Sequence, residues 1–232
     1  MPMIPITADD GGTFHALHAA PPGGSGPTVL LIQEIFGING VMRDLAADFA
    51  AQGYHVLCPD LFWRQRPGVE LTDQTEAEWA EAFALYKGFD EAAGVRDLTA
   101  TLAVARTLPG ASGKVGSVGY CLGGKLAYLT ATRTTVDCAV GYYGVGIEAA
   151  LEEAAAITNP LLLHIAGQDG YCPAAAQDAI VGRLRSVGPA TVVVHGGVDH
   201  AFARVGGQHW NAAAAAVANS MTKQFFARLL KE

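Results

Sequence analysis

Apolar residues recur with two different spacings along the chain, one typical of strands and one typical of helices. Residues 3–7 and 13–19 flank the turn-forming sequence Asp-Asp-Gly-Gly and predict an antiparallel β-hairpin. From residue 28 onward, short apolar runs typical of strands buried on both faces alternate with segments of helical spacing. The predicted strands are 28–32, 55–58, a run around Val115 and Val118, 139–143, 161–166 and 191–195. The predicted helices are 41–51, 76–87, 90–107, a helix after Cys121, 174–186 and 209–230.

This alternation predicts an α/β fold in a single domain over residues 1–232. Strands that alternate with helices form a mostly parallel, doubly wound sheet, in which ligands meet the carboxyl ends of the strands. The apolar residues of 59–75 have neither spacing, and the Trp-Arg-Gln-Arg-Pro-Gly sequence at 63–68 predicts an irregular loop or lid there.

Composition and charge narrow the class of protein. Half of the residues are apolar, 16% are charged, and the net charge of −7 is spread without long runs, which argues against nucleic acid or an anionic membrane as a partner. The N-terminus shows no secretory signal, and the longest apolar stretch, 212–218, is too short to span a bilayer. The cysteines show no paired spacing, so we expect reduced thiols in a cytoplasmic protein. They are Cys58, Cys121, Cys138 and Cys172.

The sequence Gly-Tyr-Cys-Leu-Gly-Gly at 119–124 places a thiol where a predicted strand turns into a helix. Glycines at 119 and 123 suit a strained turn, and the arrangement is that of a nucleophile elbow with Cys121 in the usual place of serine. The positive end of the helix would stabilise a thiolate, and the N–H of Leu122 would donate to an oxyanion. The alternatives are a small buried apolar residue at a tight crossing, or a glycine loop that holds phosphate.

Two further residues follow predicted strands at the same edge of the sheet. Asp169 comes after the strand 161–166, and His200 comes after the strand 191–195. The order nucleophile, acid, histidine is that of α/β-hydrolases. In these roles His200 takes the thiol proton and later activates water, while Asp169 fixes its tautomer. Singly, an Asp after a strand is often a turn former and a loop His is usually a surface residue.

Glu34 is a carboxylate at the end of a fully apolar strand. It either caps local amides or reaches the active corner, where it could accept a proton from the cysteine or form an ion pair with Arg204. The backbone N–H of Ile35 lies in the loop expected to supply a second oxyanion donor.

Six motifs together resemble the dienelactone hydrolase (carboxymethylenebutenolidase) family. They are Gln33 to Gly37, Cys58 to Leu61, Gly119 to Gly124, Gly141 to Gly144, Gly167 to Asp169 and His200 to Arg204, in the family's order and over nearly the whole chain. The resemblance implies a Cys121, His200, Asp169 triad that opens a small unsaturated lactone through a thioester. It also implies that Glu34 pairs with Arg204 at rest and accepts the Cys121 proton once substrate draws Arg204 away.

We further expect a substrate site without metal or cofactor, in a monomer. Its residues would be Arg204, which would hold a substrate carboxylate, with Phe36, Trp79, Tyr86 and Tyr142. One departure matters, because Trp79 stands where the family has a second substrate-binding arginine. Arg64 or Arg66 from the loop 59–75 could substitute for it.

Other functions fit parts of the sequence. A general carboxylesterase or thioesterase would use the same scaffold, and a relative without activity would only bind a ligand. A metal or redox site could use Cys121, Cys172, His164 and His200, but no two of these have the spacing of metal ligands.

Overall fold

The computed structural model of the chain describes residues 1–232, which divide into two compact units. The first unit is Met1–Gly116 and the second is Ser117–Glu232. Strand β5 (Ala111–Tyr120) runs through the boundary, so its end delivers the chain into the second unit.

Four strands of the first unit form a mixed sheet in the order β1-β2-β4-β3. Strands β1 (Met3–Thr7) and β2 (Thr13–Ala19) make the predicted hairpin, with Met3 opposite Leu17 and Thr7 opposite Thr13. Strand β2 is antiparallel to β4 (His55–Pro59), which is parallel to β3 (Gly26–Ile32). The hairpin prediction is confirmed at both ends.

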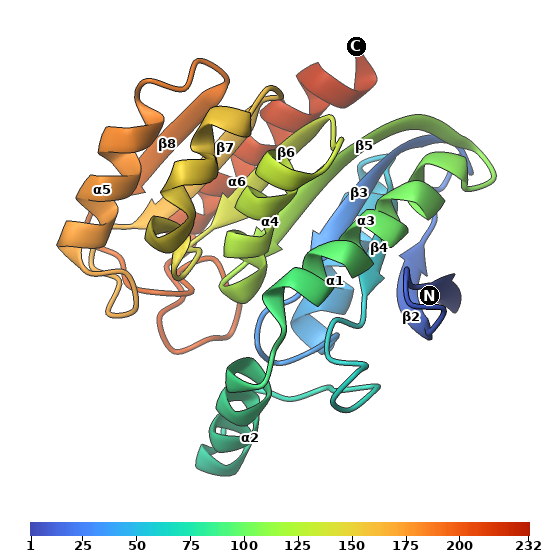
Figure 1. The fold of residues 1–232 in the computed structure, drawn as a ribbon, viewed down its shortest axis with the longest axis horizontal. Helices are drawn as coiled ribbons and strands as arrows, with labels where there is room; N and C mark the ends of the chain where they lie inside the picture. The colour runs from blue at the N-terminus through green and yellow to red at the C-terminus, as the bar shows by residue number, and fades with distance from the viewer. The chain divides into compact units, whose positions relative to one another are not determined.

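The helices of the first unit begin at side chains that cap them. Helices α1 (Gly40–Ala51), α2 (Glu76–Lys87) and α3 (Glu91–Thr107) follow Asn39, Thr75 and Asp90. Each of these side chains accepts a hydrogen bond from a first-turn N–H, which satisfies a donor without a helical partner. In Figure 1, α3 lies in front of β3 and β4 and α1 lies behind them, on the other face, while α2 stands apart from the strands.

The segment between β4 and α2 is irregular, as predicted, and side chains hold it in place. The Asp60 carboxylate accepts the N–H groups of Phe62 at 3.1 Å and Gly68 at 2.7 Å. Arg64 forms ion pairs with Asp97 and Asp10, and Arg66 forms one with Glu81. Both arginines that could replace the missing substrate cation therefore already have carboxylate partners.

The second unit has parallel strands in the order β6-β7-β8. Strands β6 (Cys138–Tyr142), β7 (Leu161–Ala166) and β8 (Ala190–His195) pair in register, with Tyr142 beside His164 and Ala166 beside His195. Helices α4 (Leu122–Arg133) and α5 (Ala174–Leu184) lie on the near face in Figure 1, and α6 (Ala212–Phe226) lies behind. This two-sided cover agrees with the doubly wound arrangement.

Two helical segments show the largest differences from the prediction. The last helix begins at 212 rather than 209, because the Asn211 side chain accepts the N–H of Ala214 at 3.0 Å and sets the start. It continues into a π-helical segment, η2 (Ala227–Lys231). The 3₁₀ segment η1 (Ile147–Ala156) was not predicted, and it is interrupted at Ala150, whose φ of −123° is not helical.

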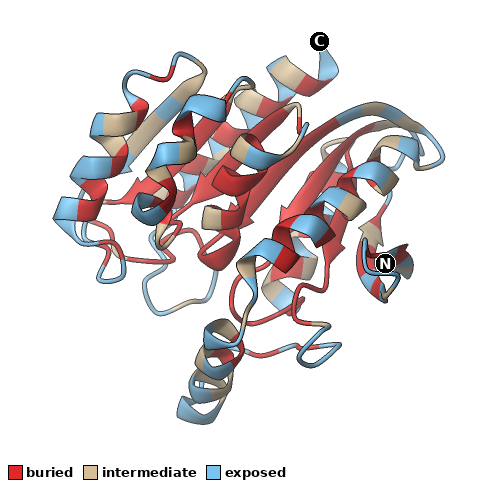
Figure 2. Cartoon of the chain, viewed as in Figure 1, coloured by how far each residue is buried: buried red, intermediate tan, exposed pale blue.

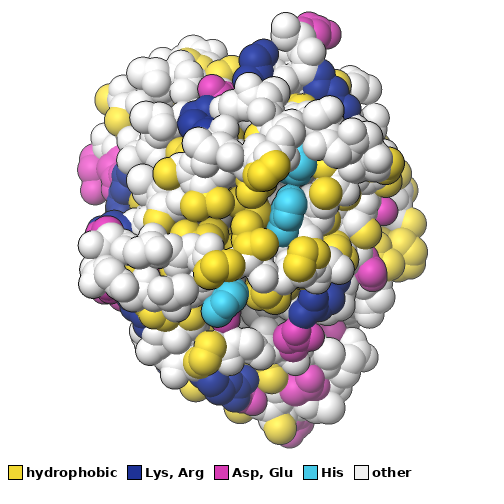
Figure 3. Space-filling model, turned by 90° about the vertical axis from the view of Figure 1, so that its right-hand side faces the viewer, with side chains coloured by type: hydrophobic (Ala, Val, Ile, Leu, Met, Phe, Trp, Pro, Cys, Tyr) yellow, Lys and Arg dark blue, Asp and Glu magenta, His cyan; other side chains and the backbone are white.

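Burial follows the layers of each unit. Figure 2 shows strands such as β4, β6 and β7 buried along their whole length, as expected for strands covered on both faces. On the face shown in Figure 3, apolar and histidine side chains lie in the middle, and basic side chains are scattered among acidic ones. No helix combines the length and apolarity that crossing a membrane requires.

Candidate active site

Cys121 occupies the corner between β5 and α4 with φ 56° and ψ −116°, a conformation that few residues other than glycine adopt. Its N–H donates to the carbonyl of Tyr142 at 3.1 Å, and its carbonyl accepts the N–H of Gly124 at 2.9 Å. A Cβ on Gly119 would lie 1.9 Å from the carbonyl oxygen of Gly123. The crowding predicted for this turn is therefore present, and it requires glycine at 119.

His200 and Asp169 form a buried pair. The Nδ1 of His200 lies 2.9 Å from Oδ2 of Asp169, and both side chains are almost fully buried. The other carboxylate oxygen, Oδ1, accepts the N–H of Tyr171 at 2.8 Å. A carboxylate held at both oxygens fixes the ring orientation of the imidazole and leaves Nε2 available to another group.

That other group is Cys121, whose side chain hydrogen-bonds the His200 imidazole. Burial by itself opposes protonation of His200, but the negative charge of the Cys121 sulfur, together with the hydrogen bonds from Asp169 and Cys121, outweighs it. These effects raise the pKa of His200 to about 10. The arrangement therefore favours the protonated, positively charged form of His200 beside the Cys121 side chain.

Aromatic rings surround the imidazole, and the sequence did not predict their role. The ring of Tyr143 lies 5.1 Å from that of His200, and the ring of Tyr171 lies 5.0 Å from it, both edge-on. Tyr143 also packs against Phe202 at 5.5 Å. Tyr171 is half exposed, so it forms an accessible wall beside the histidine. The signal was available, because Tyr143 directly follows a strand and Tyr171 lies two residues after Asp169.

Residues with a strained backbone lie at Cys121 and beside His200. The residues other than glycine with positive φ are Cys121 at 56°, Tyr143 at 37° and Ala201 at 62°. The first carries the thiol, the second touches His200 and the third follows it. Such conformations cost of order 1–3 kcal/mol each and persist where the surrounding structure holds them.

The structure places the other predicted residues of the second unit as follows. Leu122 is the first residue of α4, where N–H groups have no partner within the helix. Arg204 is buried, and its backbone N–H donates to the carbonyl of Ala201 at 2.9 Å. The buried Tyr142 hydroxyl bonds Thr222 at 2.6 Å and Asn219 at 3.0 Å, so this side chain ties β6 to α6.

The remaining predicted residues belong to the first unit. Glu34 and Ile35 are buried in the segment after β3, and the Glu34 carbonyl accepts the Gln33 side-chain amide at 3.3 Å. Phe36 meets Trp79 edge-on at 5.0 Å, and Trp79 stacks on Phe83 at 5.5 Å. Tyr86 is half-buried near the end of α2.

Of the residues that a metal or redox site could use, His164 bonds other side chains and Cys172 is a buried thiol. His164 Nδ1 lies 3.0 Å from His195 Nε2, and His164 Nε2 lies 3.2 Å from the Thr222 hydroxyl. Burial, with the charges of Asp169 and Glu148, raises the pKa of Cys172 to about 11, so this thiol stays protonated at neutral pH. No group of three or more His, Cys, Asp and Glu side chains is placed to hold a metal ion.

The buried His164 predicts a pH dependence of stability. Burial, and then the neighbouring His195, lower the pKa of His164 to about 3 from 6.5. Below pH 6.5 the unfolded chain therefore binds a proton that the folded chain excludes, which costs up to about 1.4 kcal/mol per pH unit. In urea unfolding, the wild-type free energy of unfolding should fall from pH 6.5 toward pH 3 more steeply than that of His164→Gln. Parallel curves would contradict this prediction.

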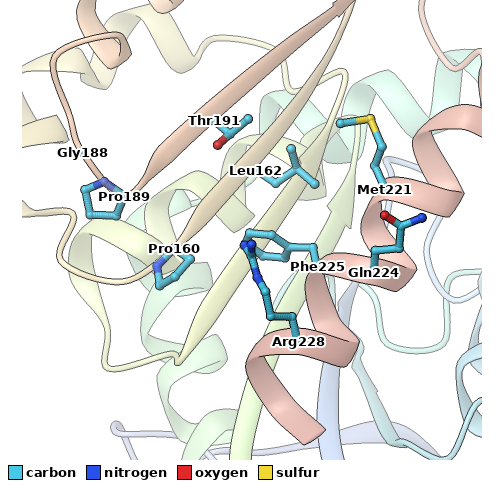
Figure 4. A pocket seen from close by; sticks show the side chains of 9 residues that line it. All are labelled: Pro160, Leu162, Gly188, Pro189, Thr191, Met221, Gln224, Phe225 and Arg228. Atoms are coloured by element: carbon cyan, nitrogen blue, oxygen red, sulfur yellow. The ribbon is translucent and has the colours of Figure 1, made fainter. Parts of the chain in front are cut away.

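A cavity of about 520 Å³ lies in the second unit, away from the carboxyl ends of the strands. Residues at the amino ends of β7 and β8 line it, together with residues of α6 and η2, as Figure 4 shows. They are Pro160, Leu162, Gly188, Pro189, Thr191, Met221, Gln224, Phe225 and Arg228. None of the predicted catalytic residues is among them.

Comparison with known proteins assigns the family. Residues 14–230 match the model of the Dienelactone hydrolase family. A carboxymethylenebutenolidase of Pseudomonas putida is 42% identical over 97% of this chain and 96% of its own length. The chain belongs to the dienelactone hydrolase family. Carboxymethylenebutenolidase 1 of Cupriavidus pinatubonensis is 39% identical over the same shares of the two chains.

Solved structures agree on the fold. A dienelactone hydrolase-like promiscuous phosphotriesterase from metagenomic libraries has a TM-score of 0.81 and 22% identity, over 99% of this chain and 98% of its own. The fold class is α/β-hydrolase, with a mostly parallel sheet flanked by helices and an antiparallel N-terminal hairpin, as predicted. This dienelactone hydrolase family member is an ester-bond hydrolase, the class of enzyme to which lactone opening belongs.

Proposed function

We propose that this enzyme hydrolyses a small unsaturated lactone that carries a carboxylate, through a thioester on Cys121. The observation that supports this most is that one imidazole, His200, bonds both the Asp169 carboxylate and the Cys121 side chain. A chain of hydrogen bonds would then link the nucleophile, its base and the group that orients the base.

In the first half of the reaction, the Cys121 thiolate attacks the lactone carbonyl carbon. A carbon–sulfur bond forms, and the carbonyl electron pair moves to the oxygen, where the N–H of Leu122 at the start of α4 donates to it. When this tetrahedral intermediate collapses, the bond from the carbonyl carbon to the ring oxygen breaks. His200, protonated at the outset, gives its proton to that leaving oxygen. The product is an open chain, held as a thioester.

In the second half, neutral His200 accepts a proton from water as the water oxygen attacks the thioester carbonyl. The carbon–sulfur bond then breaks, and its electron pair returns to Cys121 as a thiolate. The net change is the addition of one water to the lactone, which gives a hydroxyl group and a carboxylic acid. Throughout, Asp169 keeps the imidazole oriented through the 2.9 Å bond at Nδ1.

Arg204 is the group we propose for the substrate carboxylate, because a guanidinium donates two parallel hydrogen bonds to such a group. Its backbone lies four residues after His200 and is anchored to Ala201. Arg204→Ala should raise KM for anionic lactones about 10- to 150-fold, the loss of one charge-assisted contact of about 1.5–3 kcal/mol. Steady-state kinetics on matched lactones with and without a carboxylate check this. An unchanged KM for the anionic lactone would refute the role, and the uncharged lactone serves as control.

The roles assigned to residues of the first unit stay predictions from the sequence. They are oxyanion donation by Ile35 and substrate contacts by Phe36, Trp79 and Tyr86. Proton acceptance by Glu34 was predicted for a resting thiol, and the scheme above does not use it because the thiol proton already lies on His200. For Tyr142, the bonds of its hydroxyl to Asn219 and Thr222 favour a structural role. A monomer in the cytoplasm also remains the expectation.

Labelling and trapping test the proposal. Iodoacetamide at neutral pH should modify Cys121 first, abolish hydrolysis at one label per chain, and be slowed by a lactone ligand. Acid quenching during turnover should leave a mass adduct on the peptide that contains Cys121. Full activity after stoichiometric labelling of Cys121 would overturn the thioester mechanism. A panel of lactones and simple esters, with and without a carboxylate, separates this function from a general carboxylesterase or thioesterase, and no turnover of any of them would indicate a ligand-binding relative.

A further inference from the structure

Asp199 precedes His200 and has no place in the reaction derived above, yet it contacts both loops that carry the buried pair. Its Oδ1 accepts the backbone N–H of His200 at 2.6 Å. The same oxygen accepts the backbone N–H of Gly170, the residue after Asp169, at 3.2 Å. One carboxylate oxygen therefore joins the loop of the histidine to the loop of its acid.

The other bonds between these loops lie nearer the strands. The N–H of Gly167 donates to the carbonyl of His195 at 2.8 Å, and the N–H of Gln168 donates to the carbonyl of Val198 at 2.9 Å. These backbone bonds hold the bases of the two loops, while Asp199 joins them at the residues beside the pair itself. Asp199 therefore links the loops next to the 2.9 Å contact between His200 and Asp169.

The charge of Asp199 suits this position. The hydrogen bond from the His200 N–H, and then the one from Gly170, lower the pKa of the Asp199 carboxyl although burial opposes this, so it is ionised at neutral pH. Oδ2 faces the half-exposed His209, whose Nδ1 lies 3.5 Å away. Hydrogen bonds to a charged acceptor are stronger than those to a neutral one, so the charge of Asp199 strengthens a link that any acceptor oxygen at this place would make.

We propose that Asp199 is a positioning residue, whose carboxylate holds the loops of His200 and Asp169 at the separation at which the imidazole bonds Cys121. This inference rests on the proposed function of Cys121 and His200. Asp199 touches neither the thiol nor the reacting atoms in that scheme, so its loss should disturb proton transfer and leave substrate binding in place.

The test compares Asp199→Ala, Asp199→Asn and the control Asp178→Asn, which removes an exposed carboxylate from α5. Asp199→Ala should lower kcat about 10- to 100-fold, as expected for the loss of hydrogen bonds to a charged group, with KM within about twofold of wild type. Asp199→Asn keeps an acceptor oxygen and should recover most of that loss. Asp178→Asn should match wild type.

A second readout follows the pair directly, without substrate. The rate of Cys121 alkylation by iodoacetamide, measured against pH, reports the ionisation of the thiol beside His200. Asp199→Ala should displace this profile, while the asparagine and control variants should keep it. Melting temperatures show whether each variant is folded at the assay temperature.

Three outcomes are decisive. A displaced alkylation profile with a lower kcat and unchanged KM supports the positioning role. Wild-type kcat and alkylation profile in Asp199→Ala would overturn it, even if alkylation of Cys121 still abolishes activity. A loss of kcat that follows the melting temperature, with no displaced profile and no recovery in asparagine, would also overturn it. The proposed function fails separately, if the wild-type enzyme stays active after Cys121 is alkylated.

Discussion

Replacing Cys121 with alanine should reduce lactone hydrolysis by at least about 10⁴-fold in kcat, because triad nucleophiles contribute effects of that size or larger. The variant should remain folded, since alanine meets the same steric cost as cysteine at a φ of 56°. Steady-state kinetics with a lactone substrate, alongside the melting temperature, measure both expectations.

The control for this variant is Cys58→Ala. Cys58 is fully buried in β4, and burial raises the pKa of its thiol, so it should be protonated and unreactive. Removing it leaves a small cavity that lowers the melting temperature, while kcat should stay near that of wild type. Turnover by Cys121→Ala at a rate near wild type would remove this residue from the mechanism.

His200→Asn should lower kcat by about 10³- to 10⁴-fold, because one substitution removes the proton donor of ring opening and the base that activates water. Asparagine also cannot carry the positive charge that accompanies the thiolate, so iodoacetamide should label Cys121 more slowly at neutral pH. Steady-state kinetics and timed labelling followed by mass spectrometry provide the two measurements.

The matched control is His15→Asn, because His15 lies exposed on β2 and should contribute nothing to turnover. Equal losses in the two variants would point to a general effect of histidine removal. If His200→Asn kept wild-type kcat, the acid and base roles would have to be given to another group.

The fold was predictable where pattern and turn chemistry agree. Strands β1, β2 and β7 and helix α2 have the predicted bounds. The Asp-Asp-Gly-Gly turn separates β1 from β2, Pro160 and Gly167 flank β7, and a capping threonine begins α2. The segment η1 was missed although its buried residues Ile147, Ala150 and Ala154 recur at helical spacing, since the kink at Ala150 divides it into two short pieces. The start of α6 was placed three residues early, because an alanine-rich run hides the cap at Asn211.

The sequence predicted which loops carry the candidate site, but not how aromatic rings lie around it. The rule that ligands meet the carboxyl ends of parallel strands placed Asp169 and His200 at one edge, and in the structure Asp169 bonds His200, whose imidazole bonds Cys121. The rings of Tyr143 and Tyr171 depend on local backbone angles, such as the φ of 37° at Tyr143, that no pattern encodes. The tie through Asp199 likewise depends on where two loops meet.

The left-handed backbone at Cys121, Tyr143 and Ala201 bears on laboratory evolution of this enzyme. Ala201→Gly would relieve the steric cost of a positive φ and should raise the melting temperature. It would also make the backbone beside His200 more flexible and so lower kcat, the usual conflict between stability and activity. Libraries aimed at heat tolerance should therefore leave these positions fixed and vary the outer helical surfaces, where substitutions are mostly neutral.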